Sequence, residues 1–209
     1  LAARGIHFID EPVSVFLKNY QYGYSIREMP KLTKGSRLVP LFSLYSKADS
    51  DSELQKLIDR SGINTKDFVL QNLIKPLVEQ TFFLAFEHGL IGVPHEQNIL
   101  LKMVNGKLTN QFYYRDLGSF HVNRNLRNLM GLTSDFTLQN FDEKNKPGTK
   151  LEIIENIQDY LLNAQFYALK RSLRLGQVSD AWIRKEVFKL VQEQILKYTG
   201  SNVNSWMAA

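Results

Sequence analysis

The chain has 209 residues, of which 44% are hydrophobic, and this is enough to bury the core of one large domain or two small ones. It contains no cysteine, which excludes disulfides, zinc–thiolate sites, iron–sulfur clusters and thiol nucleophiles. The net charge of +5 suits phosphorylated or carboxylate ligands better than it suits a dedicated DNA-binding role.

No stretch of the sequence reaches the roughly 20 apolar residues of a membrane helix, and the N-terminus lacks the pattern of a signal peptide. We therefore expect a cytoplasmic protein without a membrane or nucleic-acid partner. The basic run at residues 170–174 is interpreted as a solvated helix face. The opening segment, residues 1–5, is typical of the interior of a protein, so we expect the chain to be a piece of a longer one.

The N-terminal part of the chain favours strands. Residues 6–28 are rich in aromatic and β-branched side chains and predict strand structure. Residues 29–37, which include Pro30 and Gly35, predict a loop. Residues 38–45 are apolar but few, so a strand and a helix both remain open.

Two helices are predicted next. Residues 46–52 are polar and are expected to form a surface connection whose serine or aspartate caps a helix beginning near Glu53. A second helix over about residues 65–88 carries a broad apolar face, and Pro76 should kink or split it. Gly89 is expected to close this helix as its C-cap residue.

A β-hairpin is predicted over residues 98–115. Its two apolar-rich runs are joined by Asn105 and Gly106, and both residue types tolerate the positive φ angles of a type I′ turn. This is the strongest short-range signal for a hairpin that a sequence can carry.

The remainder of the chain is predicted to be mainly helical from Gly118 onward. The polar residues 141–150 predict an exposed loop. Residues 151–175 and 181–198 have the pattern of amphipathic helices, and the serine or aspartate directly before the second is its expected cap.

These elements predict an α+β fold that is mainly helical. An antiparallel hairpin and a small sheet would carry the site and pack against a C-terminal helical bundle. We expect a palm-like α+β part over residues 1–120, which holds the site, and a helical, thumb-like part over residues 121–209.

Polar residues stand at both open ends of the predicted hairpin. Asn98 precedes its first strand, whereas Arg115 and Asp116 follow its second, so the turn should bring them together with His95 and Gln97. An amide oxygen beside a carboxylate suits Mg²⁺, which commonly binds one or two carboxylates plus substrate phosphates. Arg115 adds a planar donor for phosphate or carboxylate oxygens. The sequence therefore predicts a nucleotide and metal site here.

Two other functions remain open. Kinase-like phosphotransferases use a similar asparagine, hairpin and aspartate, but near His95 this chain has Glu96 and Gln97 instead of an aspartate base, and it has no glycine-rich phosphate loop. A non-enzymatic helical binding module is the second alternative. The other histidines are expected to be ordinary hydrogen-bonded or surface residues: His7, His88 and His121.

Two segments carry a resemblance to a known family. Residues 88–101, HGLIGVPHEQNILL, and residues 114–118, YRDLG, resemble the C-terminal half of siderophore synthetases of the aerobactin-synthetase type, which work independently of non-ribosomal peptide synthetases. Upstream, residues 24–28, YSIRE, and residues 37–41, RLVPL, are similar to further segments of that family.

The resemblance implies an ATP- and Mg²⁺-dependent reaction. Such enzymes adenylate a citrate-like carboxylate, and an amine, hydroxylamine or alcohol then displaces AMP. By resemblance, His95, Gln97 and Asn98 would contact the nucleotide or its phosphates. Asp116 and Asn98 would hold magnesium, with His95 and Arg115 as the catalytic residues.

The same resemblance suggests that Arg27 meets the substrate carboxylate or a phosphate.

This chain departs from the pattern of the family in two respects. The family often has a glutamate two residues before the histidine, where this chain has Val93, and the family's phosphate-binding region from its N-terminal half has no equivalent in these residues. We therefore expect an incomplete enzyme. The carboxylate, the nucleophile and the oligomeric state stay open, a homodimer being one option.

Overall fold

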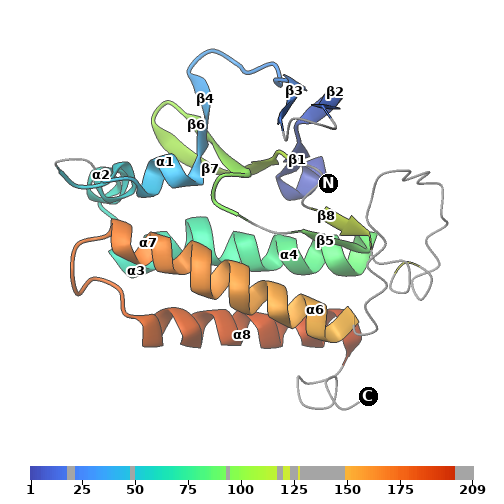
Figure 1. The fold of residues 1–209 in the computed structure, drawn as a ribbon. Coiled ribbons are helices and arrows are strands. Elements are labelled where there is room, and N and C mark those ends of the chain that lie inside the picture. Colours follow the sequence, from blue (N-terminus) through green and yellow to red (C-terminus); the bar gives the residue numbers. More distant parts are fainter. Residues whose placement is uncertain are drawn as a thin grey trace.

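The computed structural model describes residues 1–17, 22–47, 50–92, 95–116, 120–122, 127 and 149–200. A small sheet lies above a layer of long helices, so the predicted fold, α+β and mainly helical, is confirmed (Figure 1). The strands are β1 (Ile6–Phe8), β2 (Asp10–Leu17), β3 (Tyr22–Glu28), β4 (Ser36–Pro40), β5 (Leu90–Gly92), β6 (Ile99–Val104), β7 (Lys107–Tyr114) and β8 (Phe120–Val122). The helices are η1 (Ala2–Arg4), α1 (Leu41–Tyr45), α2 (Glu53–Ser61), α3 (Thr65–Val69), η2 (Leu70–Ile74), α4 (Lys75–His88), α6 (Thr149–Asn156), η4 (Ile157–Gln165), α7 (Phe166–Ser172) and α8 (Asp180–Thr199).

The main sheet has the strand order β1-β7-β6-β4. β1 runs parallel to β7, whereas β6 pairs antiparallel with both β7 and β4. The predicted hairpin is β6–β7, and its turn residues Asn105 and Gly106 have φ angles of 49° and 78°, as a type I′ turn requires. Two further pairs, β2–β3 and β5–β8, stand apart from this sheet.

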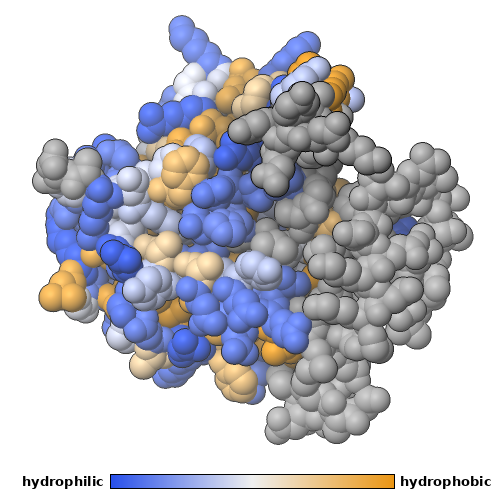
Figure 2. Space-filling view, in the orientation of Figure 1, coloured by the Kyte–Doolittle hydropathy of each residue, from blue (hydrophilic) through white to orange (hydrophobic). Residues whose placement is uncertain are grey.

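The β2–β3 pair leaves an apolar face in solvent. Val13 pairs with Ile26 and Val15 with Tyr24, and Val13, Tyr24 and Ile26 are all exposed. Figure 2 shows hydrophobic residues gathered at the top of the molecule, in the region of this pair. The strand character predicted for residues 6–28 is confirmed for the described part of that segment.

Residues 38–45, for which strand and helix had both remained open, contain one of each. The strand β4 ends at Pro40 and α1 begins at the next residue. Proline has no N–H for a sheet ladder and has a fixed φ suited to a helix start, so it divides the segment.

The helix predicted over residues 65–88 is present, but Pro76 does not split it. Helical residues continue from α3 through η2 to α4, and η2 is a π-helical segment that ends two residues before the proline. A π-helical turn relieves the missing N–H and the ring clash without breaking the rod. Gly89 closes α4 with a φ of 62°, as predicted.

The two C-terminal helical rods are also confirmed. The first runs from α6 through the π-helical η4 to α7 and ends at Ser172, and the second is α8, whose first turn is capped by Ser179 accepting from the Trp182 N–H. The expected loop over residues 141–150 is wrong at its end, since α6 begins at Thr149. Residues 141–148 lie outside the described residues.

The prediction that the chain is helical from Gly118 onward is wrong for residues 120–122. They form β8, which pairs antiparallel with β5 directly after α4. A short apolar segment can join a strand far away in sequence, and local periodicity does not reveal this. Residues 117–119, 123–126 and 128–148 lie outside the described part of the chain.

The core lies between the sheet and the helices. Alternate strand residues such as Ile6, Leu101 and Phe112 point into it, where they meet helical side chains such as Phe82 and Phe166, and all five are essentially inaccessible to solvent. Among the described residues, no helix has the length and apolar character needed to cross a membrane.

Ser52 joins two parts of the helical layer. Its Oγ accepts from the Gln55 N–H at 3.0 Å, capping α2 as predicted, and donates to the Ser172 carbonyl at 2.7 Å. The surface position expected for this end of residues 46–52 is wrong, because Ser52 is fully buried.

We expect Ser52→Ala to lower the free energy of unfolding by about 1–3 kcal/mol, since it removes an N-cap and leaves a buried carbonyl without its donor. Urea denaturation measures this loss. The exposed Ser50 supplies the control, and Ser50→Ala should leave the unfolding midpoint unchanged. Equal effects of the two substitutions would contradict the assigned role of Ser52.

Candidate functional site

The open end of the β6–β7 hairpin brings the predicted site residues together. Ile99 pairs with Tyr114, so the residues just outside this pair are adjacent, and the Arg115 N–H donates to the Asn98 carbonyl at 3.0 Å. Asn98 Nδ2 donates to Asp116 Oδ2 at 3.1 Å. The predicted convergence of Asn98 with Asp116 is thus present in the structure.

Asp116 has an unusual backbone conformation. Its φ of 62° lies in the left-handed region, which a residue other than glycine adopts at a cost of roughly 1–3 kcal/mol. The chain therefore turns sharply where it leaves β7. Strain of this kind concentrates at binding and catalytic sites, where the surrounding contacts maintain it.

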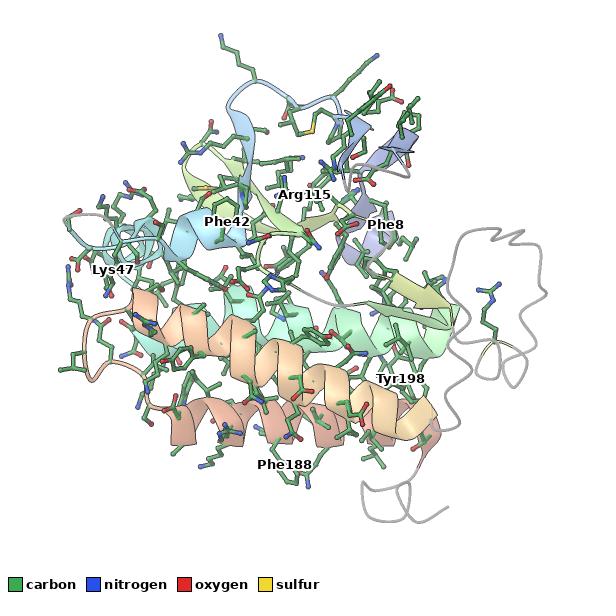
Figure 3. All side chains as sticks on the ribbon, in the orientation of Figure 1. Phe8, Phe42, Lys47, Arg115, Phe188 and Tyr198 are labelled. Atoms are coloured by element: carbon green, nitrogen blue, oxygen red, sulfur yellow. The ribbon has the colours of Figure 1, made fainter. Side chains whose placement is uncertain are left out.

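Hydrogen bonds from α1 and from the end of the hairpin hold the turn before β6, residues 95–98, in place. The Asn98 N–H donates to the His95 carbonyl at 2.8 Å, and the Glu96 carbonyl accepts from the N–H of Phe42, at the start of α1, at 3.2 Å. Arg115 Nε donates to the Gln97 carbonyl at 2.8 Å. Residues 95–98 are therefore held against both the hairpin and α1. In the view of Figure 3, Arg115 lies between Phe42 and Phe8.

Arg115 is oriented by this contact. The bond to the Gln97 carbonyl uses its Nε, so its two terminal nitrogens are the part of the guanidinium that can meet an anion. Gln97 itself is exposed and contributes its backbone oxygen to the arrangement.

A glutamate that was not predicted connects Arg27 to the site. Glu11 Oε1 accepts from Arg27 Nε at 2.5 Å and from the Asp116 N–H at 3.2 Å. Arg27, predicted to bind a carboxylate or a phosphate, therefore lies one side chain away from Asp116. In the sequence Glu11 is one acidic residue within a segment of strand character, and strand character does not reveal which part of the fold its side chain approaches.

His95, Glu96 and Tyr45 form a second polar group beside the turn. His95 Nδ1 lies 3.4 Å from Glu96 Oε2, and neither atom has a hydrogen-bond partner among the described residues. The Tyr45 hydroxyl is buried without a partner there as well. Burial, with a smaller effect from the negative charge of Glu96, raises the pKa of Tyr45 far above its usual value, so this hydroxyl stays neutral.

The site offers few metal ligands of its own. No group of three or more His, Cys, Asp or Glu side chains suited to a metal ion occurs among the described residues. The Asp116 carboxylate and the Asn98 amide are hard oxygen ligands, the type that Mg²⁺ prefers, but Mg²⁺ is six-coordinate. The pair therefore fits an ion that takes its other ligands from water and from the phosphates of a bound nucleotide.

The remaining histidines do not join this group. His7 stacks on Tyr113 at 4.4 Å, and burial, then the charges of Lys102 and the N-terminus, lowers its pKa. His88 packs edge-on against Phe83. The side chain of His121 lies outside the described residues, as do Val93 and Pro94, so the position that is often glutamate in the resembled family is not described.

Solved structures with a similar fold include aerobactin synthetases and a petrobactin biosynthesis protein. Aerobactin synthetase IucC from a hypervirulent pathotype of Klebsiella pneumoniae matches with a TM-score of 0.65 and 17% identity over 94% of this chain and 36% of its own. Petrobactin biosynthesis protein AsbB from Bacillus anthracis str. Sterne matches with a TM-score of 0.73 and 20% identity over 95% of this chain and 36% of its own. ATP-bound aerobactin synthetase IucA from Klebsiella pneumoniae matches with a TM-score of 0.64 and 22% identity over 93% of this chain and 37% of its own.

The predicted resemblance to siderophore synthetases is therefore confirmed at the level of the fold, and this chain spans little more than a third of the length of each solved protein. Neither a protein-family model nor a curated protein matches the sequence.

Proposed function

We propose that this chain is part of an ATP-dependent ligase of siderophore biosynthesis. The ligase would adenylate a citrate-like carboxylate and condense it with an amine, hydroxylamine or alcohol. One observation carries the proposal: Asn98 and Asp116 meet beside Arg115 at the end of a hairpin. The shared fold supports it, because one of the solved proteins with this fold is an ATP-bound synthetase.

The proposed reaction has two steps. A carboxylate oxygen of the acid attacks the α-phosphorus of ATP, the bond to the bridging oxygen breaks, and pyrophosphate leaves. The amine, hydroxylamine or alcohol then attacks the acyl carbon, AMP leaves with the electrons of the broken C–O bond, and the nucleophile loses its proton. The first step demands positioning and charge neutralisation more than it demands a strong base.

The residues around the hairpin end suit these demands. Arg115 would place its terminal nitrogens against phosphate oxygens, since its Nε is bound to the Gln97 carbonyl. His95 and Gln97 would donate to the nucleotide from the turn that α1 and the hairpin hold in place. Arg27, held close by Glu11, would meet the substrate carboxylate or a phosphate.

Asp116 and Asn98 would hold magnesium, which would neutralise negative charge on the phosphates when bound. The longer protein would complete the nucleotide site with donors from outside these 209 residues. Because ATP and citrate-like acids occur together in the cytoplasm, we place the reaction there.

The nucleotide product tests the proposal. We expect the protein that contains this chain to exchange labelled pyrophosphate into ATP only when a citrate-like acid is present, and to release AMP when a nucleophile is added. Release of ADP would instead assign a kinase-like phosphotransferase, and an absence of ATP binding by calorimetry would assign a non-enzymatic module.

A further inference from the structure

Glu11 touches two parts of the candidate site that are far apart in sequence. Its Oε1 accepts from Arg27 Nε at 2.5 Å on the neighbouring strand and from the Asp116 N–H at 3.2 Å at the end of β7. The Glu11 side chain is only 14% exposed, against 37% for that of Arg27. A nearly buried carboxylate therefore bridges a cation and a strained backbone position.

A β-bulge aims Glu11 at the site. Asp10 pairs with Glu28 and Val13 with Ile26, so Glu11 and Pro12 on β2 oppose the single residue Arg27 on β3. Proline cannot donate to the sheet ladder, which makes it suited to a bulge. A bulge changes the direction of a side chain without ending the strand pair, and bulges are frequent next to active sites.

The two contacts constrain different groups. The ion pair occupies Nε of Arg27, so its two terminal nitrogens are the part of the guanidinium that can meet a ligand. The second contact holds the N–H of a residue whose φ is 62°. Without Glu11, the Arg27 side chain loses the carboxylate that holds its Nε. The Asp116 backbone would still be strained, but it would lose one of the contacts that stabilise its conformation.

We infer that Glu11 is a positioning residue of the site, which holds the Arg27 guanidinium and the Asp116 backbone in one fixed arrangement around the bound nucleotide and acid. This inference rests on the proposed function. Glu11 acts through Arg27 and Asp116, in the way that residues behind metal ligands orient them, and its removal should cost roughly 10–100-fold in activity or metal affinity.

The first experiment needs no activity. Hydrogen exchange at the Asp116 amide, followed by NMR in the protein that contains this chain, reports the contact directly. Glu11→Ala should accelerate exchange of this amide, whereas Glu11→Gln, which keeps an acceptor oxygen, should accelerate it less. Glu28→Ala, an exposed glutamate on the adjacent strand, is the matched control and should leave it unchanged. Unchanged exchange in Glu11→Ala would overturn the inference.

The second experiment is a double-mutant cycle on pyrophosphate exchange. We expect Glu11→Ala to lower kcat/KM roughly 10–100-fold in the wild-type background and by a smaller factor in an Arg27→Ala background, because the Arg27 side chain that Glu11 holds is then absent and only its contact to the Asp116 N–H remains. An equal loss in both backgrounds would show that Glu11 only stabilises the fold and would overturn the inference.

The two proposals fail in different ways. If the wild-type protein neither binds ATP nor exchanges pyrophosphate, the proposed function fails, and the hydrogen-exchange result still decides whether Glu11 holds Asp116. If the wild-type protein is active, but Glu11→Ala leaves the Asp116 amide exchanging as in Glu28→Ala and loses equal activity in both backgrounds, the positioning role fails and the ligase assignment stands.

Discussion

Replacing Asp116 by asparagine is expected to abolish pyrophosphate exchange into ATP while leaving the protein folded. Asparagine tolerates the left-handed backbone of this position and keeps the shape of the side chain, so the substitution removes mainly the charge. Loss of a group that stabilises charge in the transition state costs roughly 10²–10³-fold in kcat, and loss of a proposed metal ligand should reach at least this range.

The measurement is exchange of labelled pyrophosphate at saturating Mg²⁺ and citrate-like acid. Asp116→Ala should lose as much activity and also some stability, because alanine is disfavoured at a φ of 62°. Asp67, an exposed aspartate on α3, supplies the control, and Asp67→Asn should keep full activity. Full exchange in Asp116→Asn would rule out our assignment of the metal site.

The largest expected loss of stability comes from Phe112→Ala. Phe112 is completely buried in β7, in register with Ile6 on one neighbouring strand and Leu101 on the other, and it points into the core between sheet and helices. Removing a buried phenylalanine ring costs about 3–5 kcal/mol, because the surrounding side chains fill the cavity only in part. Urea denaturation of the protein measures the change.

Phe188 on α8 offers the matched control, since its ring is more than half exposed. Phe188→Ala should change the free energy of unfolding by less than about 1 kcal/mol. Because β7 leads directly into Arg115 and Asp116, Phe112→Ala should also weaken ATP binding. A stability loss below that of Phe188→Ala would show that the core is placed incorrectly.

The features that local chemistry controls were predictable from the sequence. The turn at Asn105 and Gly106 was predicted because few residue types accept positive φ angles. A serine or aspartate of residues 46–52 was expected to cap the start of α2, and Ser52 does so with its hydroxyl oxygen, while Gly89 was expected to end α4 because glycine accepts a left-handed backbone. The predicted hairpin was also sufficient to predict that Asn98 and Asp116 lie close together, because the two residues stand at its open end.

Other features depend on contacts between distant segments. The pairing of β8 with β5 could not be read from residues 120–122, because a segment of three residues fits a strand or a helix equally well. Pro76 was expected to disturb its helix, and the π-helical turn that absorbs it forms within a helix buried on one side by the core.

Glu11 is the clearest example of a feature that depends on contacts between distant segments. In the sequence it is one acidic residue before a proline, and only the bulge in β2 and the arrival of β7 bring its carboxylate to Arg27 and Asp116. Hairpin ends converge because a short turn joins them, whereas Glu11 reaches Asp116 across 105 positions through the packing of separate strands. Sequence patterns report local preference, and the tertiary fold decides which side chains complete the site.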